Sequence, residues 1–160
     1  MVEVLAATLV FAILAVLIFK GVPFLWNRAE GVKCAENMRS LHVSLAAYVH
    51  DVGHWPQEPE SVQLSENDDL YEDWWIETLK PFGATEKVWQ CPSIQRQVVK
   101  KSKDGRPKLH YTPTPFDALP FTPYKWSTQP WLAEIGNMHG GGALLCFPDG
   151  SIRSMDDVVR

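Results

Sequence analysis

Few residues capable of chemistry occur in a pattern that indicates a reaction. His139 is followed by three glycines, and nine residues separate it from Asp149-Gly150. Histidine and aspartate can act as acid and base, but the sequence pairs neither with a nucleophile. We therefore expect no enzymatic activity, a structural hydrogen-bonding role for His139, a tight backbone at Gly140–Gly142 and a hairpin turn at Asp149-Gly150.

Metal-binding patterns are equally weak. His50 and His54 have the four-residue spacing that can place two ligands on one helical face, but Gly53 interrupts the helix and no third ligand lies nearby. The acidic stretches 66–69 and 156–157 could bind calcium, although neither has the spacing of a known calcium loop. We expect no cofactor, with calcium as the weaker alternative.

A single carboxylate, Glu3, precedes sixteen apolar or small residues, Val4 to Phe19. A helix of this run is about 24 Å long, and its extension to Trp26 could cross a bilayer. A signal peptide is disfavoured because Glu3 stands where a basic residue would be expected. Lys20 and Arg28 favour a cytoplasmic far side, so either a basic leader has been removed ahead of Met1 or the topology is unusual.

The helical pattern continues beyond this run. From Asn27 to Val52 apolar residues recur at spacings of three and four, which predicts one stripe of an amphipathic helix; they are Val32, Ala35, Met38, Leu41, Leu45, Tyr48 and Val49. Gly53 suits the end of this helix. Gly21 and Pro23 predict a kink or local melting at the junction.

Short apolar segments punctuated by proline make up the rest. The pattern predicts a helix over 70–82, a brief strand or extended segment over 88–91, a hairpin pairing 97–101 with 107–112, and two strands over 143–147 and 151–155. The seven tryptophans are expected in the core and in subunit interfaces, with an exposed aromatic platform as the alternative. The net charge of −4 excludes an extensive nucleic-acid surface.

The predicted fold class is α+β: a long N-terminal helix packed on a small antiparallel sheet. Residues 1–26 would form a hydrophobic membrane or filament-core helix. Residues 27–160 would form a globular domain, with an amphipathic spine helix over 27–53 and loops and sheet over 54–160.

The sequence resembles type IV pilin-like proteins, including the pseudopilins of type II secretion. The resemblance lies in the opening MVEVLAATLVFAILAVL, in the segment CAENMR with Tyr48 and Asp51, in Cys91-Pro92-Ser93, and in the signature His139, nine residues, Asp149-Gly150. These pieces cover most of the chain in order. The family usually has two more residues before its early glutamate.

This resemblance implies a subunit of a helical filament, with a pilin-like fold. A prepilin peptidase would remove a short leader in the bacterial inner membrane, and pilus or secretion machinery would assemble the subunits into a periplasmic or cell-surface filament. Glu3 would pair with a neighbouring subunit's amino terminus, since each charge would be costly to bury alone. Met1, Gly21 and Pro23 would belong to the assembly segment.

An exported domain would lie in an oxidising compartment. We therefore expect a Cys34–Cys91 disulfide, with two free buried thiols as the alternative, and Cys146 as a small buried residue of a strand. Two other functions remain open: an ordinary single-pass membrane anchor, or an anchored periplasmic enzyme or binding protein that uses His139 and Asp149.

Overall fold

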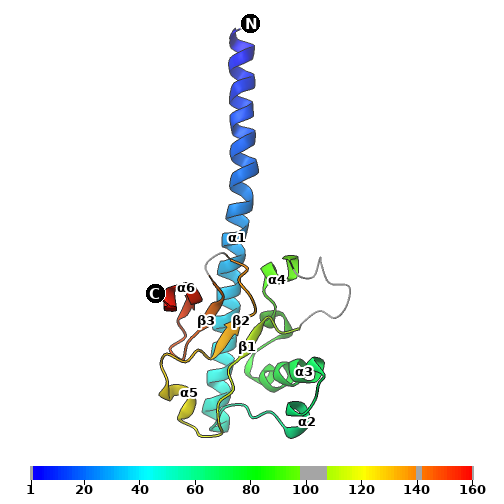
Figure 1. The fold of residues 1–160 in the computed structure, drawn as a ribbon, viewed down its shortest axis with the longest axis vertical. Helices are drawn as coiled ribbons and strands as arrows, with labels where there is room; N and C mark the ends of the chain where they lie inside the picture. Colours follow the sequence, from blue (N-terminus) through cyan, green and yellow to red (C-terminus); the bar gives the residue numbers. More distant parts are fainter. Residues whose placement is uncertain (1, 98–107, 140–141, 160) are drawn as a thin grey trace.

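The computed structural model describes residues 2–97, 108–139 and 142–159; the side chains of residues 2, 5–7, 18–24 and 97 lie outside this description. A single long helix carries all other elements on its C-terminal half (Figure 1). The helices are α1 (Val2–Val52), α2 (Glu60–Gln63), α3 (Asp68–Leu79), α4 (Pro92–Gln97), α5 (Thr122–Lys125) and α6 (Met155–Val159), with 3-10 helices η1 (Lys80–Phe82) and η2 (Glu86–Trp89). The strands are β1 (Tyr111–Pro113), β2 (Leu132–Glu134), β3 (Leu144–Cys146) and β4 (Ile152–Ser154).

Helix α1 is continuous over 51 residues. Local melting, one of the two alternatives predicted at Gly21 and Pro23, is therefore wrong: a proline inside a helix removes one backbone hydrogen bond, and the turns on either side remain helical. The other alternative, a kink, stays a prediction. The predicted end is confirmed, because α1 stops at Val52 and Gly53 adopts φ +88°. The amide of Gly53 donates to the Val49 carbonyl, which completes the last turn.

The buried stripe of α1 differs slightly from the predicted one. Its fully covered apolar residues are Cys34, Met38, Leu41, Leu45 and Val49, at the expected spacings of three and four. Val32 was predicted to be on this stripe but is 65% exposed. The stripe thus begins at Cys34, where the domain first covers the helix.

Two predictions for the middle of the chain are wrong in part. Residues 70–82 are helical as expected, in α3 and η1. A brief strand or extended segment was predicted over 88–91, but 86–89 form the 3-10 helix η2, and Gln90 directly after it is extended. A short apolar run does not distinguish strand from helix by periodicity. Gln97 ends α4, and β1 pairs with β2; residues 98–107 of the predicted hairpin lie outside the described residues.

The four strands form an antiparallel meander in the order β1-β2-β3-β4. Tyr111 lies opposite Glu134, Leu132 opposite Cys146, and Cys146 opposite Ile152. The last hairpin, β3 and β4, confirms the two predicted C-terminal strands. The described part of the chain is thus α+β, as expected, with a sheet beside the lower half of α1 (Figure 1).

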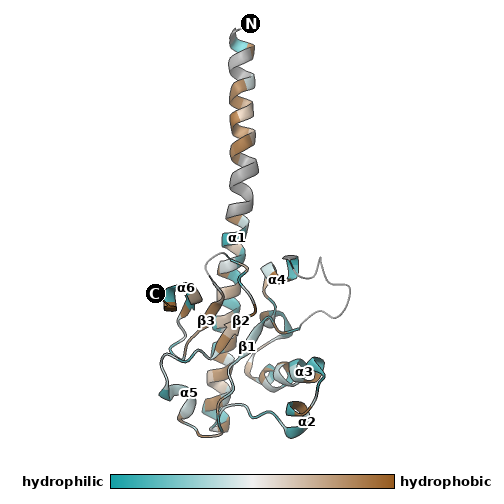
Figure 2. Ribbon diagram, viewed as in Figure 1, coloured by the Kyte–Doolittle hydropathy of each residue, from teal (hydrophilic) through white to brown (hydrophobic). Residues whose placement is uncertain are grey.

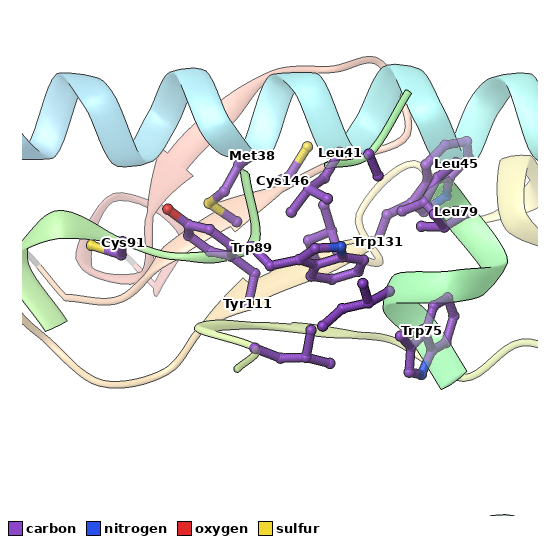
Figure 3. Close-up of a cluster of buried hydrophobic side chains, with 14 of the residues drawn as sticks. Met38, Leu41, Leu45, Trp75, Leu79, Trp89, Cys91, Tyr111, Trp131 and Cys146 are labelled. Atoms are coloured by element: carbon purple, nitrogen blue, oxygen red, sulfur yellow. The ribbon is translucent and has the colours of Figure 1, made fainter. Parts of the chain in front are cut away.

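Tryptophan supplies much of the core between helix and sheet (Figure 3). Trp55, Trp75, Trp89 and Trp131 are at most 1% exposed. Trp131 lies at the centre: its ring stacks on His42 of α1 with centroids 4.8 Å apart, and it meets Trp55 edge to face. Four tryptophans therefore serve as core, as the sequence predicted.

We expect Trp131→Ala to lower the free energy of unfolding by about 3–5 kcal/mol, because it removes a fully buried indole whose Nε1 donates to the Pro123 carbonyl. Urea denaturation followed by circular dichroism would measure this. Trp126→Ala is the matched control, since Trp126 is 53% exposed, and should change stability by less than about 0.5 kcal/mol. Equal losses in the two variants would contradict the assigned core.

Candidate functional site

The N-terminal half of α1 is the first candidate site. It projects away from the domain, and many of its described residues are hydrophobic (Figure 2). The large apolar side chains described there are exposed. Those described are Val4, Leu9, Val10, Phe11, Ile13, Leu14, Val16, Leu17, Leu25 and Trp26. Phe11 is 75% exposed and Leu9 63%. Contiguous apolar surface of this kind marks an interaction surface.

Glu3 lies exposed in the first turn of α1, at the far end of this surface. Gly21 and Pro23 lie within the continuous helix, and Met1 is outside the described residues. Among the described residues, no helix combines the length and the apolar character needed to cross a membrane. The membrane crossing expected from the sequence therefore stays a prediction.

The second candidate site is a polar cluster where α1 enters the domain. It is built on the Cys34–Cys91 disulfide, which the sequence analysis expected and which is present. The carboxylate of Glu134, at the end of β2, and the imidazole of His139, in the β2–β3 connection, lie against it. The ligand atoms of these four residues are all within 4.8 Å of one another.

His139 is the hub of this cluster. Its Nε2 lies 3.0 Å from Glu134 Oε1 and 3.6 Å from Cys91 Sγ, and its Nδ1 lies 3.4 Å from Ser93 Oγ. The ring also packs on α1 at Gly31, where a Cβ would come within 3.3 Å of Nδ1. A larger residue at position 31 would push the ring out of place, so Gly31 permits this contact.

Ser93 resembles a nucleophile beside a histidine, but its hydrogen bonding differs from that of an activated serine. Its hydroxyl donates to Glu30 Oε2 at 2.7 Å, and the same carboxylate oxygen receives Arg96 Nη2 at 2.9 Å. A serine has one hydroxyl proton, and here Glu30 accepts it. Ser93 is also 1% exposed. Ser93, Glu30, Arg96 and His139 therefore form a packed hydrogen-bond network.

His139 has an oxygen atom beside each of its ring nitrogens. Nε2 faces the Glu134 carboxylate, and Nδ1 faces the Ser93 hydroxyl oxygen, whose proton is donated to Glu30. Burial raises the pKa of Glu134, while the charge of a protonated His139 and the Leu144 amide act in the opposite direction.

Hydrogen bonds from the surrounding core hold the disulfide in position. The Cys91 amide donates to His110 Nδ1 at 2.8 Å, and the Tyr111 hydroxyl donates to the Cys34 carbonyl at 3.3 Å. Asn37, one turn after Cys34, donates to the Gln90 carbonyl at 3.0 Å. The bridge thus joins α1 to the η2–α4 connection at a point that β1 also contacts.

The other half of the sequence signature lies elsewhere. The Asp149 carboxylate accepts the Ser151 amide at 2.9 Å. Hydrogen bonding from the Ser151 side chain, and then from this amide, lowers the Asp149 pKa. Gly150 has φ +75° and packs on His42. Because His139 meets α1 at Gly31, the two contacts are 42 − 31 = 11 residues apart, about 16 Å along the helix. The signature residues therefore make two separate contacts with one helix.

The remaining metal candidates have structural partners. His54 Nδ1 lies 2.8 Å from the Trp55 carbonyl oxygen, and His50 is exposed. In the acidic stretches, Asn67 caps α3 and Asp157 accepts a hydrogen bond from Ser154 at the start of α6. Carboxylates at helix N-termini are stabilised by the helix dipole. Calcium binding there stays a prediction. Gly140 and Gly141, next to His139, are outside the described residues.

Glu134 and Ser93 were not predicted from the sequence as partners of His139, nor was Glu30 as the acceptor of the Ser93 hydroxyl. Only Ser93 carried a signal, since it follows Cys91-Pro92 directly. Glu134 looks like an ordinary surface glutamate in the sequence, although it is 4% exposed. Its tertiary position, at the end of a central strand, decides its role.

We expect the Cys34→Ala/Cys91→Ala double variant to lose about 2–5 kcal/mol of unfolding free energy, because the bridge constrains a long loop of the unfolded chain. The two cysteines are 57 positions apart. Urea denaturation of the oxidised wild type and of the variant would measure this difference. If the urea midpoint and the denaturant dependence of unfolding were the same in both proteins, the disulfide would not be stabilising.

Cys146 is free and buried in β3. Burial raises the pKa of its thiol from 9.0 to about 12. The unfolded thiol therefore ionises first, so the contribution of Cys146 to stability should fall as pH rises from about 9 to 12. We expect iodoacetamide to label it at pH 8 only after denaturation, as mass spectrometry would show. Rapid labelling of native protein would contradict this environment.

Comparison with known proteins identified no relative. No protein-family model, no curated protein and no solved structure matches this chain.

Proposed function

We propose that this protein is a structural subunit of a type IV pilus-like filament, which polymerises through the N-terminal half of α1. Before assembly the subunit would reside in the bacterial inner membrane. Prepilin peptidase and pilus or secretion machinery would be its partners, and the filament would be periplasmic or extracellular.

One observation carries this proposal: the described apolar side chains in the N-terminal half of the 51-residue helix α1 are exposed. Exposed apolar side chains gain stability when they are removed from water, at about 25 cal/mol per Å². Side-by-side packing of identical helices would bury them, with the domains on the outside. A second copy of the same surface is the simplest occupant of such a helix.

Glu3 would then decide how the helices align. A carboxylate inside an apolar bundle needs a positive partner, and a neighbour's α-ammonium supplies one. Removing one member of such a pair leaves the other charge buried and uncompensated, which costs about 3–5 kcal/mol. Only the alignment that joins the two charges avoids this cost.

An enzyme or binding protein that uses His139 and Asp149 is less well supported. His139 contacts α1 at Gly31, whereas Gly150, the neighbour of Asp149, packs on His42 further along the helix. The polar atoms around His139 are engaged with one another. A catalytic role would need these groups to act together on one molecule.

Glu3→Ala and Glu3→Leu should reduce filament assembly by on the order of 100-fold or more, because each leaves a neighbour's amino terminus unpaired. Assembly would be counted by negative-stain electron microscopy of cells or of purified protein, with circular dichroism to confirm equal helix content.

Glu36→Ala is the matched control for this experiment. Glu36 lies on the same helix and forms an exposed ion pair with Lys33 at 2.9 Å, which contributes little to stability. The control should assemble like the wild type. Normal assembly of both Glu3 variants would contradict the proposal that Glu3 sets the alignment of neighbouring helices.

A further inference from the structure

We propose that the protein binds one zinc ion through Cys34, Cys91, Glu134 and His139 when the Cys34–Cys91 disulfide is reduced. This inference is independent of the filament proposal, since it rests on the polar cluster alone. The junction between α1 and the domain would thus have two states, one held by the disulfide and one held by the metal ion.

The donor set matches what zinc prefers. Two thiolates, one imidazole nitrogen and one carboxylate oxygen give the four ligands of a tetrahedral site. Their donor atoms come from three separate places in the chain, α1, the residue before α4, and the β2–β3 region, yet all lie within 4.8 Å of one another. Ligands that converge from distant segments define a closed site around one point.

The distances also fit. Tetrahedral zinc with bonds of about 2.3 Å to sulfur and 2.0 Å to nitrogen places these two atoms roughly 3.6 Å apart. Cys91 Sγ and His139 Nε2 are 3.6 Å apart already. Glu134 Oε1 lies 3.0 Å from the same nitrogen and would move outward by a few tenths of an ångström. The two sulfurs would separate on reduction to roughly 3.8 Å.

The neighbours of these ligands would orient them. With Nε2 on the metal, the Nδ1 proton of His139 can donate to Ser93 Oγ, which itself donates to Glu30. The other oxygen of Glu134 accepts the Leu144 amide at 3.3 Å, and the Cys91 backbone is held by His110. Hydrogen bonds of this kind fix ring orientation and ligand position at zinc sites.

Burial indicates a structural site. Cys34 and Cys91 are fully buried, and Glu134 is 4% exposed. Zinc sites with four protein ligands and no open position contribute to folding, whereas catalytic sites keep one position for water or substrate. The ion would thus replace the disulfide as the link between α1, the residue before α4 and the sheet.

The two states are connected by balanced chemistry. A dithiol reductant gives two electrons and two protons to the Cys34–Cys91 bond and becomes a disulfide itself. The two thiols then lose their protons to solvent as zinc binds. A disulfide-bonded partner would reverse the sequence: it takes up two electrons, the bridge forms again, and the ion is released.

The experiment uses the full chain in detergent, reduced and desalted without oxygen, and titrated with Co²⁺ and then Zn²⁺. We expect one Co²⁺ per chain, with thiolate-to-cobalt absorption and tetrahedral visible bands that zinc abolishes. The disulfide-bonded protein should bind at least about 100-fold more weakly, since its sulfurs are not thiolates.

Variants separate this site from adventitious thiol binding. His139→Ala and Glu134→Gln should change the cobalt spectrum and weaken binding, and Ser93→Ala should weaken it by about 10- to 100-fold. Cys146→Ala is the matched control, because Cys146 is outside the cluster, and should bind like the wild type.

Three results would overturn the proposal. The first is a reduced protein that keeps its helix content and binds no stoichiometric cobalt. The second is a His139→Ala variant with an unchanged cobalt spectrum. The third is a reduced protein that unfolds and does not recover its circular dichroism when zinc is added. Recovery on adding one equivalent of zinc would support the proposed site.

Discussion

The packing of one face of α1 against the sheet is the constraint on which the rest of this structure depends. From Cys34 to Val49 the apolar stripe is covered by the domain, whereas the described apolar residues before Gly31 are bare. The same helix is therefore a core element from Cys34 to Val49, whereas its N-terminal half projects beyond the domain (Figure 1) and its described apolar side chains are exposed. Because α1 is continuous, any force on its free half is transmitted directly into the core.

The polar cluster lies at the boundary between these halves. Cys34 is the first buried residue of the stripe, and Glu30 and Gly31, in the preceding turn, contact Ser93 and His139. The cluster thus fixes the point at which the helix leaves the domain, and His42 with Gly150 fixes a second point further along. Two separated attachments resist tilting of the helix better than one, which suits a subunit whose helix is proposed to carry the assembly contacts.

Much of the fold could be predicted from local signals. Spacings of three and four revealed the spine of α1, Gly53 marked its end, and Asp149-Gly150 marked the last hairpin. In the middle of the chain the helix over 70–82 could be predicted, but the conformation of 88–91 could not, because such a short run has no periodicity that separates strand from 3-10 helix. For the cluster, only the disulfide and a hydrogen-bonding role for His139 could be predicted. Glu134 becomes a buried partner of His139, and Glu30 a partly buried partner of Ser93, only through tertiary packing.

The central claim is that identical copies of α1 bury their free halves against one another. A helical reconstruction of assembled protein by electron cryomicroscopy tests this most directly. If the filament assembles as proposed, the map will show a core of packed α1 helices with the domains outside. Each Glu3 carboxylate will lie within ion-pair distance of a neighbouring subunit's amino terminus. Monomers alone, or filaments in which Glu3 lies far from any cation, would contradict it.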